Sequence, residues 1–312
     1  MSGVEPTLDP DLAAAIRAVP GWAGRPPARV APLPGGITNR NFRVEVGGAA
    51  YVVRLPGKDT ALLGIDRSAE WEATRAAALA GVAPEPVAFL PEHGVLVTRF
   101  LDAEPLPADA LAREDILTPV VTAIRTLHAM PPIASRFSPF RVVREYGRIA
   151  TDRGVPAPAA YAAALARAGE IERACQARPA PPTPCHNDLL AANFLLRPGR
   201  VFIVDYEYAG MGDPFFDLGN FAVNNGLPDD ALPALLERYR GTVTRSTLAR
   251  LTLMRIVSDF REAMWGVVQQ AISTLSVDYG GYARRHFDRC LASAGDARYP
   301  SWLAEAASPD GG

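Results

Sequence analysis

The sequence predicts an α+β protein of two lobes, a small β-rich N-terminal lobe with one main helix and a larger helical C-terminal lobe. The first hundred residues contain alternating apolar and polar segments separated by turn residues, which is typical of β-hairpins. Later segments repeat apolar residues at helical spacing. A chain of 312 residues can supply each lobe with its own core. We expect lobes over residues 1–102 and 103–312, joined by a linker near residue 103.

The expected N-terminal lobe begins with a short helix near Pro10, a residue that suits the first helical turn. FRVEV and YVVRL alternate on either side of Gly47 and Gly48, so the pattern over Phe42–Leu55 predicts a β-hairpin. AEWEATRAAALAGV has helical composition and ends in a glycine. PVAFL and GVLVTRF predict a second hairpin.

The expected C-terminal lobe is helical. Apolar residues recur at helical spacing in EDILTPVVTAIRTLHAM and AAYAAALARAGEIERAC. The proline-rich segment RPAPPTP separates these helices from the segment HNDLLAAN. DDALPALLERYR and the long segment STLARLTLMRIVSDFREAMWGVVQQAISTL are also predicted helices. We find no internal repeat.

Charge and composition exclude several classes of partner. The net charge of −2 gives no basic footprint for nucleic acid or for an anionic membrane surface. No apolar run approaches the ~20 residues of a membrane span, and the N-terminus lacks the features of a signal peptide. Three widely spaced cysteines suit a reducing compartment and offer no zinc spacing. We expect a cytoplasmic protein; the sequence does not predict its oligomeric state.

Three oxygen-bearing side chains lie close together in HNDLLAAN and the VFIVD segment after it. Asn193 comes five residues after Asp188, and Asp205 comes seventeen residues after Asp188, at the end of an apolar strand. The protein-kinase catalytic loop has an acid and an amide at the same separation, because phosphoryl transfer needs a carboxylate for the hydroxyl and oxygen ligands for magnesium. Asp and Asn in loops are usually turn formers or caps, but the combination favours catalysis.

We assign roles to these residues from the same chemistry. Asp188 is the expected base that accepts or orients the attacking hydroxyl. Asn193 and Asp205 are the expected magnesium ligands. His186 is expected to brace the loop by hydrogen bonding.

HNDLLAANFL, VDYEYAG and DPFFDLGNF together resemble the choline/ethanolamine kinase branch of the aminoglycoside phosphotransferase-like kinases. The likeness runs from about Pro34 to about Tyr282. It implies a two-lobed, protein-kinase-like fold with ATP and Mg²⁺ in the cleft. By the same resemblance, the substrate is a small amino alcohol, choline first and then ethanolamine.

The resemblance also implies a phosphate-covering loop. LPGGITNRNF offers Gly36 for close backbone approach and Thr38 and Asn39 as donors, although PGG is also an ordinary turn.

The expected phosphate contact is Arg54, where protein kinases carry lysine; an exposed strand arginine is the alternative. Its partner is expected to be Glu70, with Glu72 at the surface. The backbone of Arg99 to Leu101 is expected to meet adenine.

Aromatic faces hold quaternary ammonium groups by cation–π attraction. By resemblance the acceptor site would contain Tyr208, Trp265, Tyr279 and Tyr282, with Glu207 nearby; the alternative for aromatic residues on helices is a core position.

One further acidic residue matches the family, and two other positions depart from it. Asp217 matches an acidic position of the family but is expected instead to brace the catalytic loop through backbone N–H groups. Eukaryotic choline kinases have a second tryptophan where this chain has Val268, and a glutamate where it has Asn224. These departures weaken the choline assignment and leave open a smaller amino alcohol or another alcohol as the acceptor. An aminoglycoside or other small-metabolite kinase is the nearest alternative. An inactive nucleotide-binding regulator is a third, which the joint presence of the catalytic, metal and phosphate-binding candidates argues against.

Overall fold

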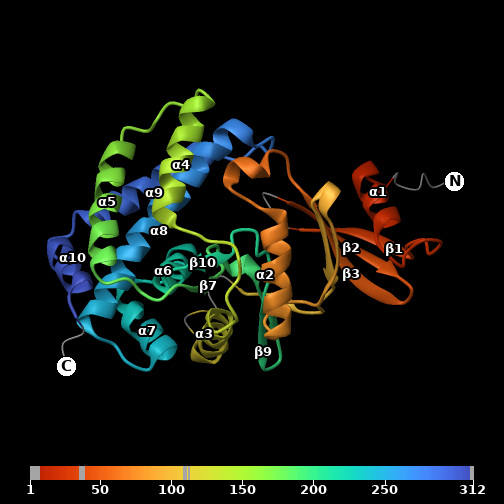
Figure 1. The fold of residues 1–312 in the computed structure, drawn as a ribbon, viewed down its shortest axis with the longest axis horizontal. Coiled ribbons are helices and arrows are strands. Elements are labelled where there is room, and N and C mark those ends of the chain that lie inside the picture. The colour runs from red at the N-terminus through yellow and green to blue at the C-terminus, as the bar shows by residue number, and fades with distance from the viewer. Residues whose placement is uncertain (1–7, 35–38, 108–110, 112, 310–312) are drawn as a thin grey trace.

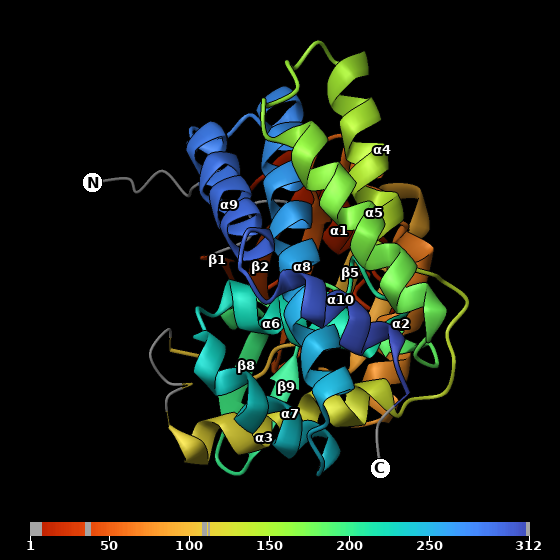
Figure 2. The same cartoon turned by 90° about the vertical axis from the view of Figure 1, so that its left-hand side faces the viewer.

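The computed structural model describes residues 8–34, 39–107, 111 and 113–309. A sheet-rich part formed by the N-terminal third of the chain lies beside a larger, mostly helical part, as the sequence predicts (Figure 1). Turned by 90°, the long helix α8 is seen running through the helical part, with α9 and α5 alongside it (Figure 2). The bounds of these three helices are Arg245–Ile272, Tyr279–Ala294 and Tyr161–Ala177.

The N-terminal sheet has five antiparallel strands in the order β1-β2-β3-β5-β4. Both expected hairpins are present, and Gly47 and Gly48 form the first turn with φ of +60° and +79°. These φ values favour glycine. Strand β1 was not expected, because Pro32 interrupts its pattern and it lies at the sheet edge. The strands are β1 Arg29–Leu33, β2 Asn39–Val46, β3 Ala49–Pro56, β4 Pro86–Leu90 and β5 Val95–Arg99.

Two helices accompany this sheet, and they belong to different cores. Helix α1, Pro10–Ala18, packs Leu12 and Ile16 into the sheet's own apolar cluster. Helix α2, Arg67–Leu79, instead buries Ala73 and Ala77 in the large cluster that it shares with the helical part. The two parts therefore do not have fully separate hydrophobic cores.

The helical part contains the helices expected from the sequence and several that were not. Small two- and three-stranded sheets, β7-β10 and β6-β8-β9, lie among them. The expected helices are α3 Glu114–His128, α5, α7 Leu232–Arg240 and α8; the additional ones are α4 Pro139–Asp152, α6 Pro214–Asn224, α9 and α10 Tyr299–Ala307. The short strands are β6 Glu104–Pro105, β7 Thr183–Cys185, β8 Phe194–Arg197, β9 Arg200–Ile203 and β10 Gly210–Gly212.

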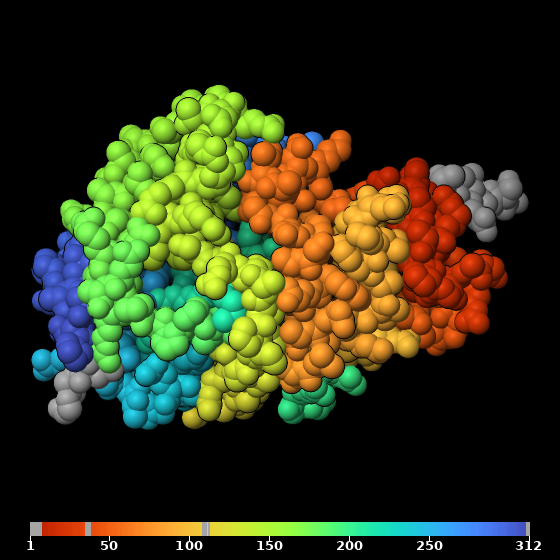
Figure 3. Space-filling model, in the orientation of Figure 1, coloured from red at the N-terminus to blue at the C-terminus, as the bar shows by residue number. Residues whose placement is uncertain are grey.

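The two parts touch along α2, which borders the helical part in the space-filling view (Figure 3). There the exposed Glu72 carboxylate accepts a hydrogen bond of 3.3 Å from the backbone N–H of Ala134. Farther along the same border, the N–H of Ile203 at the end of β9 donates to the carbonyl of Val82, 2.7 Å away. Within the described ranges, no helix has both the length and the hydropathy to cross a membrane.

Candidate active site

The loop after β7 brings Asp188, Asn193 and the end of β9 together. The side-chain amide of Asn193 donates to the backbone carbonyl of Asp188 at 2.9 Å. The carbonyl of Asn193 accepts from the N–H of Val204, also at 2.9 Å, directly before Asp205. The buried strand β9 and these two hydrogen bonds therefore fix all three predicted oxygen-bearing residues in one place.

The backbone is unusual on both sides of this site. Asn187 has φ of +66° and Asp205 has φ of +69°, which is the left-handed region. Residues other than glycine, asparagine and aspartate rarely adopt this backbone conformation. The buried side-chain amide of Asn187 offsets part of that cost, because it donates to the carbonyl of Tyr208 at 3.0 Å.

Asp217, from α6, braces the catalytic loop as the sequence suggested. Its fully buried carboxylate accepts hydrogen bonds from the backbone N–H groups of His186 and Asn187, at 2.7 and 2.6 Å. It also lies 2.9 Å from Nε2 of His128, whose Nδ1 lies 2.7 Å from the Tyr239 hydroxyl. His128 was not expected in this role.

His186 joins the loop to the segment after β9. Its Nε2 lies 3.0 Å from the carbonyl of Val204, so this nitrogen carries the proton and donates. Burial lowers the pKa of the His186 ring, which keeps it neutral. The geometry matches the bracing role expected for this residue.

Arg54 extends from β3 of the N-terminal sheet to the site. Its Nη1 donates to Oδ1 of Asp205 at 2.8 Å, and its Nη2 forms an ion pair with Glu70 on α2. Burial opposes the charge of Arg54, but the carboxylates of Glu70 and Asp205 outweigh it and raise its pKa. The expected pairing with Glu70, and the exposure of Glu72, are both present.

A second arginine, Arg67 at the start of α2, joins three segments. Its guanidinium donates to Glu70 at 2.8 Å, to Glu207 at 3.0 Å and to the side-chain oxygen of Asn39 at 3.0 Å. Asn39 in turn donates to Glu207 at 2.8 Å. Burial, followed by the charge of Asp205, raises the pKa of Glu207. Sequence reasoning missed Arg67, because its partner Glu207 is 140 residues away.

The remaining nucleotide predictions have mixed outcomes. Gly36 and Thr38 lie outside the described residues. The backbone N–H of Arg99 already donates to the carbonyl of Glu85 at 2.8 Å, and its guanidinium lies 4.8 Å from the centre of the Tyr51 ring. Arg99 is therefore a sheet residue whose N–H is not free for adenine, and contact of adenine with the rest of the Arg99 to Leu101 backbone stays a prediction. The N–H of Leu101 has no backbone partner within the described ranges.

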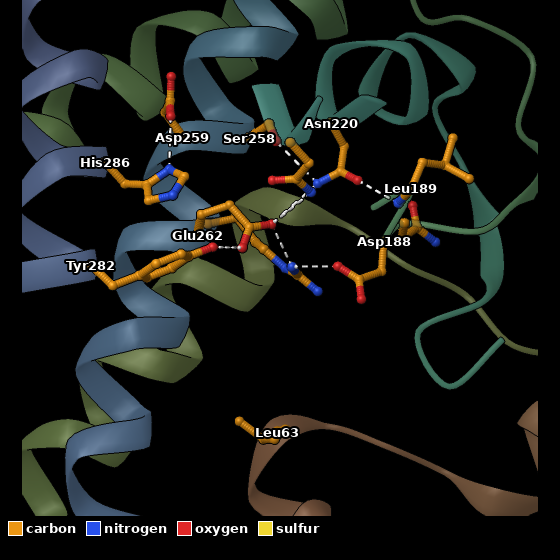
Figure 4. A network of polar contacts seen from close by, with 12 residues as sticks. Leu63, Asp188, Leu189, Asn220, Ser258, Asp259, Glu262, Tyr282 and His286 are labelled. Carbon is orange, nitrogen blue, oxygen red and sulfur yellow. Dashed lines mark hydrogen bonds and ion pairs between the residues drawn. The ribbon is translucent and has the colours of Figure 1, made fainter. Parts of the chain in front are cut away.

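The carboxylate of Asp188 faces a buried cluster of charges from α8. Nη1 of Arg261 donates to Asp188 Oδ1 at 3.2 Å and to Glu262 Oε1 at 2.7 Å. Figure 4 shows Glu262 at the centre of this network, between Asp188 and Tyr282. Burial raises the pKa of Asp188; Arg261 opposes the shift, and Glu262 adds to it. Neither Arg261 nor Glu262 was singled out from the sequence.

Three predicted aromatic residues meet at α8 and α9. The ring centre of the partly buried Trp265 lies 5.9 Å from that of Tyr279 and 5.7 Å from that of Tyr282. Tyr279 is a buried residue, and its hydroxyl lies 2.8 Å from Ser273 Oγ. Tyr282 donates to Glu262 Oε2 at 2.8 Å.

The predicted Tyr208 is buried elsewhere, with its ring centre 4.5 Å from Cζ of Arg261. A cavity of about 200 Å³ is lined by Tyr208 and Glu207 together with residues of α4 and of the segment from Leu63 to Ala69, but not by Trp265. The structure thus separates the predicted acceptor residues into two groups.

The two departures from the eukaryotic pattern have a physical outcome. Val268 is fully buried in the large core cluster. Asn224 donates to Glu262 Oε1 at 3.4 Å, so a carboxylate from α8 lies beside the position where the expected anion is absent.

The donor set fits a magnesium ion. With its amide nitrogen held by the Asp188 carbonyl, Asn193 leaves its side-chain oxygen for a ligand. Asp205 accepts a hydrogen bond from Arg54 through its Oδ1, and its side chain remains 28% exposed. Two hard oxygen donors next to a partly open position suit Mg²⁺, which keeps several waters or phosphate oxygens.

Comparisons with known proteins identify the family to which this chain belongs. The sequence model described as the phosphotransferase enzyme family (APH) matches residues 29–251. The protein LicA of Haemophilus influenzae is 28% identical over 268 residues, covering 81% of this chain and 76% of LicA. A solved choline/ethanolamine kinase family protein from Mesorhizobium loti is 31% identical with a TM-score of 0.82, covering 95% of this chain and 98% of that one. Choline kinase LicA from Streptococcus pneumoniae, 22% identical over 90% of this chain and 96% of that one, shares the fold at a TM-score of 0.75.

The fold is protein-kinase-like, and the chain belongs to the phosphotransferase enzyme family. Within that family it falls in the choline/ethanolamine kinase branch. It is an enzyme of the class that transfers a phosphoryl group to an alcohol.

Proposed function

We propose that the protein is an ATP- and Mg²⁺-dependent kinase that phosphorylates the hydroxyl of a small amino alcohol, with choline and ethanolamine as first candidates. The observation that carries the proposal is the hydrogen-bonded arrangement of Asp188, Asn193 and Asp205, with Arg54 reaching Asp205 from the N-terminal sheet. This arrangement supports acceptor, metal and nucleotide at one point between the two parts.

In this proposal each residue has one task. Asp188 orients the acceptor hydroxyl and takes its proton as the oxygen attacks the γ-phosphorus and the bond to the β-phosphate oxygen breaks. Asn193 and Asp205 hold Mg²⁺, which when bound neutralises charge on the phosphates. Arg54, held by Glu70, contacts a phosphate oxygen.

The amine of the acceptor would lie against the aromatic group on α8 and α9. Trp265 is partly exposed, and Tyr282 orients Glu262 by its hydroxyl hydrogen bond. A ring face and a carboxylate are the two features that hold an ammonium group. Tyr279 supports the ring of Trp265, edge to face.

An acceptor screen tests the proposal. ATP consumption is measured with choline, ethanolamine, thiamine, homoserine and aminoglycosides, with and without Mg²⁺. Turnover of an amino alcohol that requires Mg²⁺ supports it. Turnover of aminoglycosides alone would contradict the proposal and indicate an aminoglycoside phosphotransferase.

The catalytic assignment is tested by Asp188→Asn, which keeps the shape of the side chain. Loss of a general base costs about 10²- to 10⁴-fold in turnover. ATP affinity, measured by calorimetry, should change little because Asp188 faces the acceptor side. Unchanged turnover would refute the role of Asp188.

A further inference from the structure

The side chain of Asp188 is held in place through one of its two oxygens. Oδ1 accepts a hydrogen bond of 3.2 Å from Nη1 of Arg261, on helix α8. Oδ2 accepts no hydrogen bond from the residues that the structure describes, yet it is not among their buried atoms without a partner. The side chain is 12% exposed, so Oδ2 keeps access to solvent. This second oxygen is the one left for an acceptor hydroxyl.

The backbone and the side chain of the catalytic loop are fixed to the same point on α8. Nη1 of Arg261 also donates to Oε1 of Glu262, at 2.7 Å. The side-chain amide of Asn220 donates to that oxygen at 3.2 Å, while its Oδ1 accepts from the backbone N–H of Leu189 at 2.7 Å. Figure 4 shows these contacts between Glu262 and the loop. They close a ring that leaves the Asp188 carboxylate little freedom to rotate.

Arg261 is an unfavourable residue for this interior. It is 1% exposed, and its Nε and Nη2 are buried without a hydrogen-bond partner among the described residues. Its Cζ lies 4.5 Å from the ring centre of Tyr208, which restricts its movement. A buried ion pair with unsatisfied donors rarely stabilises a fold more than apolar residues of similar size would. Natural proteins keep groups of this kind in active sites, where function needs them although stability does not.

We infer that Arg261 is the positioning residue of the phosphoryl transfer, holding Oδ1 of Asp188 so that Oδ2 faces the acceptor hydroxyl. The inference rests on the proposed function, because that function gives Asp188 the task of orienting the hydroxyl. Arg261 itself touches neither acceptor nor nucleotide, and it needs no opening to solvent. It contributes to the chemical step, since a displacement of about 1 Å in a reacting group can lower the rate by about a hundredfold.

Helix α8 supplies a matched control for this role. Arg250 is also buried, and its Nε donates to Oδ2 of Asp213 at 3.1 Å. Its Nη1 donates to the backbone carbonyls of Cys175 and Arg178. Among the described residues, none of these partners belongs to the catalytic loop. Substitutions at Arg250 therefore remove a buried ion pair of the same helix without moving Asp188.

The four variants are Arg261→Lys, Arg261→Met, Arg250→Lys and Arg250→Met. kcat, KM for ATP and the melting temperature are measured with an alcohol that the wild type phosphorylates. We expect Arg261→Met to lower kcat by about tenfold or more. Arg261→Lys should lower it less, because lysine keeps the charge and one donor but loses the planar geometry. KM for ATP should stay unchanged in both, since Asp188 faces the acceptor side.

The Arg250 variants should lower the melting temperature and leave kcat unchanged. A normal kcat in both Arg261 variants would overturn the inference. So would a fall in kcat that follows the melting temperature across all four variants, because that pattern indicates a structural role alone. Where Arg261→Met does not fold, Arg261→Lys decides against its Arg250 counterpart.

A double-mutant cycle shows whether Arg261 acts through Asp188. Arg261→Lys is made in the wild type and in Asp188→Asn, and kcat is compared within each background. The substitution should lower kcat in the wild type but not in Asp188→Asn, where the carboxylate that it positions is already absent. An equal fall in both backgrounds would overturn the inference. The comparison with Arg250 decides where the residual turnover of Asp188→Asn is too small to measure.

The same measurements separate this inference from the proposed function. If the wild type phosphorylates only aminoglycosides, the amino alcohol is rejected as acceptor, and the Arg261 variants assayed with an aminoglycoside still decide the inference. Turnover of an amino alcohol with normal kcat in the Arg261 variants would reject the inference and keep the proposed function. A wild type that phosphorylates no alcohol would overturn both.

Discussion

Nη1 of Arg54 donates a hydrogen bond of 2.8 Å to Oδ1 of Asp205, although the two residues are 151 positions apart. This contact joins strand β3 of the N-terminal sheet to the segment after β9 of the helical part. The proposed phosphate ligand and one proposed metal ligand therefore hold each other in place. Binding of nucleotide and metal should be coupled through this pair.

Replacing Arg54 by methionine should weaken ATP binding by about tenfold or more, because the buried Glu70 carboxylate and the half-buried Asp205 carboxylate lose their shared cation. KM for ATP and its dependence on Mg²⁺ concentration are the measurements. Arg43→Met, on the neighbouring strand β2 and 36% exposed, serves as the control. An Arg54→Met enzyme with normal KM for ATP would contradict the assignment.

Arg67 should hold its three partners in place for nucleotide binding without touching the acceptor. Its loss leaves Glu70, Glu207 and Asn39 without their common donor, so Arg67→Met should raise KM for ATP several-fold while KM for the acceptor stays unchanged. Arg75→Met changes an exposed arginine of the same helix and should be neutral. If both KM values rise equally, Arg67 has only a general structural role.

Asp217→Asn should destabilise the protein by roughly 3 kcal/mol, since an amide cannot accept all the buried hydrogen bonds from His186, Asn187 and His128. Urea unfolding measures the change in unfolding free energy, with the exposed Asp230→Asn as the control. A loss within experimental error of the control would show that the loop does not depend on this carboxylate.

Ionisation of Glu262 should make the unfolding free energy depend on pH in the acidic range. Burial alone would raise its pKa, but Arg261 and then His286 outweigh burial and hold the pKa of Glu262 below its ordinary value. A depressed carboxyl pKa contributes stability above the unfolded-state pKa and loses it as the pH falls through the folded-state pKa.

The unfolding free energy of the wild type should therefore fall more steeply below about pH 4.5 than that of Glu262→Gln, which has no proton to bind there. Chemical unfolding at a series of acidic pH values checks this. Parallel curves for the two proteins would contradict the predicted linkage.

Local patterns in the sequence were sufficient for much of the fold. The hairpin at Gly47 and Gly48 and helices α3, α5 and α8 follow from periodicity and turn chemistry. Helix α6 was missed because all its residues from Pro214 to Val223 are buried, so it has no polar face. Helix α9 was missed because Gly280 and Gly281 in its first turn resemble a loop.

The site residues also fall into those that a local sequence pattern reveals and those that it does not. Asp188, Asn193 and Asp205 are close in sequence and have fixed spacing, so a motif reveals them. Arg67 and Arg261 act on partners 140 and 73 residues away, through contacts that only the folded chain creates. Arginines without a local motif cannot be distinguished from surface charges by sequence pattern alone.

The left-handed backbone at Asn187 and Asp205 limits how this region can vary. In a library that encodes every amino acid at both positions, selection for folding alone should leave mainly glycine, asparagine and aspartate. The residues allowed at these two positions would then reflect chain geometry before any demand from chemistry. A variant that fails at position 187 would say more about conformational strain than about phosphate transfer.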